Sequence, residues 1–166
     1  GIFTLPIDVD PGQNNFTLTS KGGSDIFIMA LDDNGDYRRA KSFGGLGNEI
    51  LGDIDVDTDG RLFLTGSFNQ NVDFDPSSST FQLISAGEKD VFVSMYKSSG
   101  DFIYGTSIGG SGIDEGSDII TSGKNSFVLS GNFSNTVDFD LTSGVYNLMS
   151  NGYSDTFISK YEFPDN

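Results

Sequence analysis

The sequence contains no cysteine, no histidine and no tryptophan. Without cysteine there can be no disulfide, no thiolate nucleophile and no cysteine-ligated zinc site. Without histidine the commonest general base is missing, so Ser–His–Asp and Cys–His sites are excluded within this chain. Only carboxylate, lysine or tyrosine chemistry remains, and we expect a protein that is not an enzyme.

Basic residues are scarce as well. The 166 residues include 9 Lys and Arg against 24 Asp and Glu, which gives a formal net charge of −15. Such a charge repels phosphate backbones, so we expect no nucleic-acid partner. The sequence also has no run of 18 apolar residues, and we expect no membrane insertion. The acidity fits a solvated surface and is compatible with divalent-cation binding.

Glycine and phenylalanine are abundant, with 22 and 15 residues. Glycine at this density indicates many turns, and aromatic residues favour strands. No long amphipathic helical stretch is present. The composition therefore predicts an all-β fold with short connections.

The chain matches itself without gaps when it is shifted by 65 residues. The clearest aligned segments are 8–11 with 73–76 and 138–141, 24–28 with 89–93 and 154–158, and 42–45 with 107–110. A fixed period of this length is typical of repeat architectures.

Each unit is predicted to hold four antiparallel strands. In the middle copy the first surrounds Ile54 and Val56, and the second follows an Asp59-Gly60 hairpin turn. The third and fourth are expected over 90–96 and 102–108.

The third strand places Val91, Val93 and Met95 on one face and Phe92 and Tyr96 on the other. Because both faces are apolar, this sheet should be covered on both sides by neighbouring sheets. The pattern predicts β-propeller-like, four-stranded antiparallel blades. A β-solenoid is the alternative, but its coils are shorter and lack repeated hairpin signals.

The chain holds about 2.5 units, all in one repeat domain. Residues 1–36 form a partial leading repeat, the second half of a blade plus the start of a hairpin. Residues 37–101 form a repeat, and residues 102–166 form a repeat that lacks its last strand. Since 2.5 units cannot close a ring, we expect a fragment of a longer propeller, a homo-oligomer that completes a ring, or a filament.

One long segment resembles a known repeat. The run Asp53-Ile54-Asp55-Val56-Asp57-Thr58-Asp59-Gly60-Arg61-Leu62-Phe63-Leu64-Thr65-Gly66 follows Gly44-Gly45 and precedes Asp90-Val91-Phe92-Val93. This arrangement resembles the bacterial SBBP-type β-propeller repeat, and the Val-Asp-Phe-Asp-Pro insertion is similar to variants in Bacteroidetes surface proteins. The resemblance covers essentially the whole chain. It implies an extracellular or cell-surface bacterial protein and supplies no catalytic residue.

An Asp-x-Asp pair recurs once per unit, at Asp8 and Asp10, Asp73 and Asp75, and Asp138 and Asp140. In an extended segment residues i and i+2 share a face, so each pair could converge on one cation, with calcium as the candidate cofactor. The alternative is that these carboxylates cap turns through local backbone N–H groups. The segment 55–60 matches the first half of an EF-hand loop, but a hairpin turn accounts for it better.

Other recurring residues have structural interpretations. Asp25, Asp90 and Asp155 should fix the start of the third strand through bonds to the backbone. The aromatic sets Phe3, Phe68 and Phe133, and Phe16, Phe81 and Tyr146, are expected to pack between blades.

The sequence favours a non-enzymatic secreted or cell-surface module for binding, adhesion or scaffolding. Its partner would be a protein or glycan at a loop face, or copies of itself. The first alternative is a structural subunit of an extracellular fibre or ring assembly. The second is a carboxylate-based glycosidase or lyase using Glu49 with Asp114 or Glu115, which requires these acids to share one cleft.

Overall fold

The computed structural model describes residues 1–123 and 125–162, and this part of the chain is all-β. Its strands are β1 (Ile2–Phe3), β2 (Ile7–Asp8), β3 (Thr17–Leu18), β4 (Asp25–Leu31), β5 (Tyr37–Gly45), β6 (Ile50–Val56), β7 (Leu62–Phe68), β8 (Asn71–Asp73), β9 (Gln82–Ile84), β10 (Asp90–Tyr96), β11 (Phe102–Ile108), β12 (Glu115–Thr121), β13 (Ser126–Phe133), β14 (Thr136–Asp138), β15 (Asn147–Met149) and β16 (Asp155–Glu162). The same residues include no helix long and apolar enough to cross a membrane.

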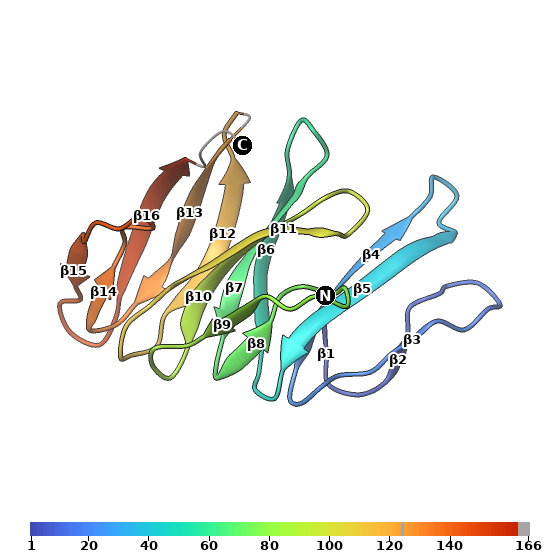
Figure 1. Ribbon diagram of the computed structural model, residues 1–166, viewed down its shortest axis with the longest axis horizontal. Helices are drawn as coiled ribbons and strands as arrows, with labels where there is room; N and C mark the ends of the chain where they lie inside the picture. The colour runs from blue at the N-terminus through green and yellow to red at the C-terminus, as the bar shows by residue number, and fades with distance from the viewer. Residues whose placement is uncertain (124, 163–166) are drawn as a thin grey trace.

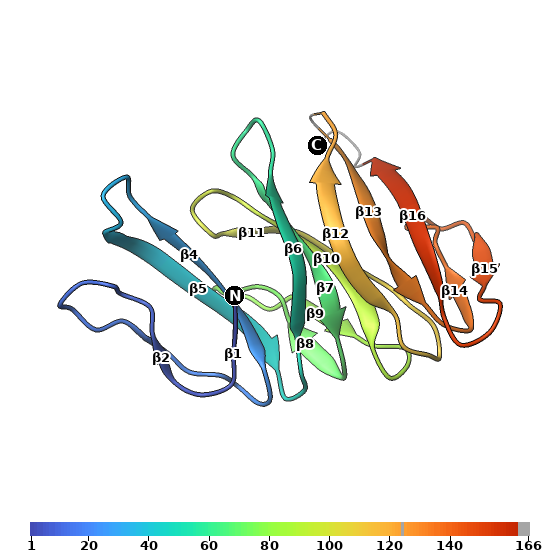
Figure 2. The ribbon, with the colours of Figure 1, turned by 180° about the vertical axis from the view of Figure 1, so that it is seen from behind.

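Three antiparallel sheets stand in a row and fan out from one another (Figure 1). The middle sheet has the strand order β11-β10-β7-β6, and the third sheet has the order β12-β13-β16. The first sheet consists of β1, β4 and β5 and is extended by β8 and β9. The view from behind shows the same succession of first, middle and third sheets (Figure 2). The predicted all-β, antiparallel architecture is therefore confirmed.

The strands recur with the 65-residue period. β6 and β12 begin at Ile50 and Glu115, β4 and β10 at Asp25 and Asp90, and β8 and β14 at Asn71 and Thr136. The four-stranded order predicted for the middle copy is present. The first sheet has only the end of a second strand before its third and fourth, and the third sheet has the first three strands.

β10 is the most deeply buried strand, because all seven of its residues are buried. Val91, Val93 and Met95 share a core cluster with the third sheet, whereas Phe92 and Tyr96 share one with the first sheet. The predicted division of this strand into two apolar faces is confirmed. Burying an aliphatic or aromatic side chain stabilises a fold by about 1.5–3 kcal/mol. Because β10 buries such side chains on both faces, it stabilises the packing of the middle sheet against both of its neighbours.

The segment that matches half of an EF-hand loop is a hairpin turn between β6 and β7. The Asp57 amide donates to Arg61 O at 3.0 Å, and the Gly60 amide donates to Asp57 O at 3.0 Å. Gly60 has φ of 76°, a left-handed conformation that favours glycine. Asp57 Oδ1 accepts the amides of Asp59 and Arg61, which uses this carboxylate as a turn cap.

Candidate functional site

The first aspartate of each Asp-x-Asp pair holds a small hairpin together. These hairpins (β2–β3, β8–β9 and β14–β15) are inserted between the second and third strands of each unit. Asp73 Oδ1 accepts the Asp75 amide at 3.1 Å and the Phe81 amide at 2.9 Å, which lies across the hairpin. Asp8 and Asp138 each make the same two bonds in their own hairpins.

The second aspartate of each pair stabilises the tip of the same hairpin. Asp10, Asp75 and Asp140 each accept, through Oδ1, the amide two residues further on, at 2.8–2.9 Å. This is the Asx-turn bond that aspartate commonly makes in loops. All six predicted metal-site residues therefore have the turn-capping geometry of the alternative interpretation.

The calcium prediction remains untested by these contacts. Within residues 1–123 and 125–162 no group of three or more acidic side chains is close enough to hold a metal ion. Two carboxylates with backbone carbonyl and hydroxyl oxygens remain a ligand set that calcium accepts. The arrangement supports a structural role directly and a metal site only as a hypothesis.

The inserted hairpins also join neighbouring sheets. β8 pairs with the end of β5 through Gly44↔Asp73 and Gly45↔Val72, and a single bridge joins Gly110 to Val137 one repeat later. A β-carbon at Gly45 would collide with Asn71 O, and one at Gly110 would collide with Thr136 O. The recurring Gly-Gly therefore permits close backbone contact between units, a role that the sequence signal did not reveal.

The two recurring aromatic sets behave differently. Phe3, Phe68 and Phe133 are buried, as predicted. Phe81 packs against the core cluster between the first and middle sheets, but Phe16 and Tyr146 are 40% and 64% exposed, so the prediction of core packing is wrong for these two. These aromatics lie on the inserted hairpins, where Phe16 packs on Tyr37 of β5 and Phe81 packs on Phe102 of β11. The residues that do anchor the hairpins in the core are Val9, Phe74 and Phe139.

Glu49 and Asp114 occupy equivalent positions one repeat apart. Glu49 lies in the connection between β5 and β6, and Asp114 lies in the connection between β11 and β12. The side chain of Glu115 pairs with Lys89 Nζ at 3.0 Å. Glu49 and Asp114 are both fully buried in separate connections, an arrangement that does not favour a glycosidase pair built from them.

Each of these buried acids instead lies beside the aspartate that begins a third strand. Glu49 and Asp25 are 0% and 1% exposed, and both border Gly44. A β-carbon at Gly44 would collide with Asp25 Cγ and lie 2.6 Å from Glu49 Oε2. Glu49 Oε2 accepts the Gly45 amide at 3.0 Å and Asp25 Oδ2 accepts the Lys21 amide at 2.8 Å. Asp25 Oδ1 and Glu49 Oε1 are buried without a hydrogen-bond partner.

Burial controls the ionisation of this pair. It raises the pKa of Glu49 to about 7, and the adjacent Asp25 charge adds to the effect, while the Gly45 amide and Lys21 oppose it. Burial also raises the pKa of Asp25. Two buried carboxyl groups at one point favour a state in which at least one is protonated. The folded pair therefore keeps a proton on Glu49 up to about pH 7, well above the ordinary range of a glutamate.

The same contact recurs one repeat later between Asp90 and Asp114. Both are buried, and burial raises the pKa of each. Asp114 accepts the Gly110 amide at 2.8 Å and the Ser134 amide at 2.9 Å. The Ala86, Lys21 and Asn151 amides donate to Asp90, Asp25 and Asp155, which confirms the predicted role of these aspartates at the start of the third strand.

Two carboxylates of β6 bind the first strand of the next sheet. Asp53 Oδ2 accepts the Ile119 amide at 3.1 Å, and Asp55 Oδ2 accepts the Thr121 amide at 2.7 Å. A hydrogen bond with Asp53 raises the pKa of the exposed Asp118. Asp53 and Asp55 of β6 therefore connect the middle sheet to the third sheet.

Comparison with known proteins adds no identification. A scan of known protein families finds no match to this chain, and a search of curated proteins finds none that is significantly similar.

Proposed function

We propose that the chain is a β-propeller-like repeat module, with the three sheets as successive blades, and that it serves binding, adhesion or scaffolding. The observation that carries this proposal is the burial of both faces of the middle sheet by its neighbours. Sheets packed face to face at a fixed sequence period are what propeller blades require. The number of blades in a closed ring would follow from a scattering envelope of the assembled protein.

The proposal includes a bacterial, secreted or cell-surface location and no catalytic role. The location rests on the SBBP-type resemblance. The proposal of no catalytic role is supported by the missing histidine and cysteine. It is also supported by the positions of Glu49 and Asp114 in different connections. Protease accessibility of the protein on intact producing cells tests the location.

A protein or glycan bound at the loops is the proposed partner. Loops carried by rigid sheets are the usual place for such sites. Binding to panels of immobilised glycans and extracellular proteins should show saturable partners whose affinity changes when loop residues are replaced. Cleavage of a bound glycan by the protein would contradict the non-enzymatic proposal.

The structural alternative, a subunit of a ring or fibre, is favoured by exposed apolar residues on the sheets. Ile54 and Val56 on β6 and Ile158 on β16 are 43%, 53% and 74% exposed. Light scattering separates the outcomes: a closed oligomer of fixed mass indicates a ring, and mass that grows with concentration indicates a fibre. A monomer at all concentrations contradicts both forms of the alternative.

Calcium at the Asp-x-Asp hairpins is proposed as a cofactor. If a hairpin binds the ion, calcium should raise the melting temperature, chelation should lower it again, and Asp75→Asn should reduce the calcium response. Asp33→Asn is the matched control, because Asp33 is exposed and lies outside the Asp-x-Asp hairpins, in the turn between β4 and β5. A melting temperature that is indifferent to calcium and chelator would leave the aspartates as turn caps alone.

A further inference from the structure

The backbone holds two buried acids side by side where the connection 109–114 packs on the start of β10. Lys89 forms a parallel bridge with Ile113, and the Asp114 amide donates to Lys89 O at 2.9 Å. Asp90 and Asp114 are the next residues of the two segments, so their side chains project from backbones about 4.8 Å apart. They are 2% and 0% exposed.

The same arrangement is present at the start of β4. The Glu49 amide donates to Ser24 O at 2.7 Å, which is the equivalent bond one repeat earlier. Glu49 therefore lies beside Asp25, and both side chains are buried. This pair and the pair of Asp90 and Asp114 are called the carboxyl junctions below.

Three oxygens of the carboxyl junctions have no hydrogen-bond partner among the residues that the structure describes. They are Asp25 Oδ1, Glu49 Oε1 and Asp90 Oδ1, and all three are buried. A buried carboxylate is normally paired with a donor or coordinates a metal ion. These oxygens therefore indicate a ligand other than a side chain of the described residues.

The carboxyl groups converge because a glycine leaves room for them. Asp25 Oδ1 and Glu49 Oε2 lie 2.7 Å and 2.6 Å from the position that a β-carbon on Gly44 would take. Asp90 Oδ1 lies 2.6 Å from the same position on Gly109. A larger residue at either glycine would push the carboxyl groups away from their place.

The negative charge of the carboxyl junctions is not balanced by a basic side chain. None of the ion pairs in the described part of the chain includes a junction acid. Lys21 donates its backbone amide to Asp25 Oδ2 at 2.8 Å, but its side chain is exposed. Two carboxylates at each junction therefore carry a charge that one divalent cation would balance.

We propose that each carboxyl junction binds one calcium ion, between Asp25 and Glu49 and between Asp90 and Asp114. Calcium takes oxygen ligands in flexible geometry, whereas magnesium demands a near-ideal octahedron and keeps several waters, which a buried pair does not favour. Water or backbone carbonyl oxygens would complete the ligand set. Since each connection leads from the fourth strand of one unit to the first strand of the next, calcium would strengthen the contact between successive sheets.

These sites are separate from the Asp-x-Asp hairpins and do not depend on the partner or location proposed above. In the calcium-free chain a proton takes the place of the ion, and the raised pKa of Glu49 belongs to that state. Calcium would displace this proton, because metal ligands bind in their deprotonated form.

The test is a calcium titration of the full chain, labelled with nitrogen-15, in chelator-treated buffer at pH 8. The Gly45 and Gly110 amides donate to Glu49 and Asp114, so their resonances report the two carboxyl junctions separately. Both resonances should shift saturably with a dissociation constant of about 1 mM or less, the range of extracellular calcium modules. Magnesium at the same concentration should produce smaller shifts.

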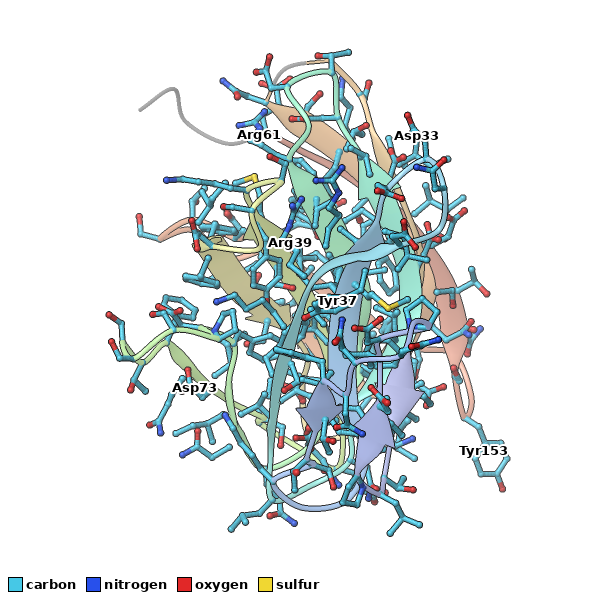
Figure 3. The ribbon with its side chains drawn as sticks, turned by 90° about the vertical axis from the view of Figure 1, so that its right-hand side faces the viewer. Asp33, Tyr37, Arg39, Arg61, Asp73 and Tyr153 are labelled. Carbon is cyan, nitrogen blue, oxygen red and sulfur yellow. The ribbon has the colours of Figure 1, made fainter. Side chains whose placement is uncertain are left out.

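The hairpin proposal is read from a different amide in the same titration. The Phe81 amide donates to Asp73, which lies on the β8–β9 hairpin at one side of the molecule (Figure 3). A shift of Phe81 alone would support the hairpin site and contradict the junction sites. Shifts of Gly45 and Gly110 alone would do the reverse.

Two variants serve as controls for each other. Glu49→Gln should weaken calcium binding at the first junction about tenfold or more, read at Gly45, while Gly110 keeps its response. Asp114→Asn should remove the Gly110 response and leave that of Gly45. The amide that keeps its response also shows that the variant is folded.

Asp33→Asn controls for a general effect of charge. Asp33 is exposed and lies in the turn between β4 and β5, at the end of these strands opposite to the junction (Figure 3). This change should leave both responses unaltered. Gly45 and Gly110 resonances that stay fixed up to about 10 mM calcium, or that shift equally in every variant, would overturn the proposal. Resonances that move with pH but not with calcium would show that the junctions hold protons only, which also contradicts it.

Discussion

At the scale of single residues, the most consequential feature is the pair of buried carboxyl groups on either side of Gly44. Glu49 and Asp25 are almost wholly buried and each leaves one oxygen without a hydrogen-bond partner. A buried group that must stay neutral links folding to protonation. The stability of the protein should therefore depend on pH in a direction that the geometry defines.

The ordinary pKa of Glu49 is 4.5, and burial raises it to about 7 in the folded chain. Between these values the folded state holds more protons than the unfolded state, so the free energy of unfolding falls as pH rises from 4.5 to 7. Glu49→Gln removes the titrating proton and keeps the shape. It should stabilise the chain by about 1–2 kcal/mol at pH 8 and change it little at pH 5, measured by urea unfolding.

Glu88→Gln is the matched control, because Glu88 is exposed and its replacement should leave stability unchanged at both pH values. A loss of stability in Glu49→Gln that is equal at pH 5 and pH 8 would contradict the protonation argument. That result would mean that the bond from the Gly45 amide needs a charged acceptor.

At the scale of elements, the inserted hairpins are the parts that join one sheet to the next. β8 continues the first sheet from β5, and Val137 of β14 bridges to Gly110 after β11. The aspartates Asp73 and Asp138 hold these hairpins in shape through bonds across them. The hairpins thus connect each unit to the fourth strand of the unit before it.

Gly110→Val tests this connection. Its β-carbon would collide with the backbone at Thr136 O, so the bridge to Val137 should break and the free energy of unfolding should fall by about 2 kcal/mol or more. Amide exchange should accelerate in β14 and β15 before it does in β6 and β7. Ser143→Ala, an exposed change at the tip of the β14–β15 hairpin, should have little effect. Unchanged exchange in β14 would show that the hairpin holds its place without the bridge.

Local signals explain which elements could be predicted. The Asp59-Gly60 turn and the two apolar faces of β10 each depend on residues that are close together in the sequence, and both predictions are confirmed. The Gly45 contact with Asn71 and the burial of Glu49 beside Asp25 depend on segments more than 20 residues apart, and sequence patterns alone do not place these together. The recurrence of Tyr146 predicts its burial wrongly, because a recurring residue does not show whether a covering strand lies within the described part of the chain.

At the scale of the whole molecule, the three sheets are linked through two separate core clusters. One cluster lies between the first and middle sheets and contains Ile26 and Phe92; the other lies between the middle and third sheets and contains Ile119 and Val93. In repeat proteins of this kind each unit contacts its neighbours only, so stability is approximately a sum over units and interfaces. A defect in one cluster should therefore have its main effect on two sheets.

Ile119→Ala and Ile26→Ala form a matched pair for this prediction, because both isoleucines are 0% exposed and each lies in a different cluster. Each change should cost about 2–5 kcal/mol. Hydrogen exchange followed by mass spectrometry should show faster exchange in β12, β13 and β16 for Ile119→Ala, and in β4 and β5 for Ile26→Ala. The middle sheet should respond to both, since it shares both clusters. Uniform acceleration along the whole chain in either variant would mean that the sheets unfold as one cooperative unit, and the nearest-neighbour description would then be wrong.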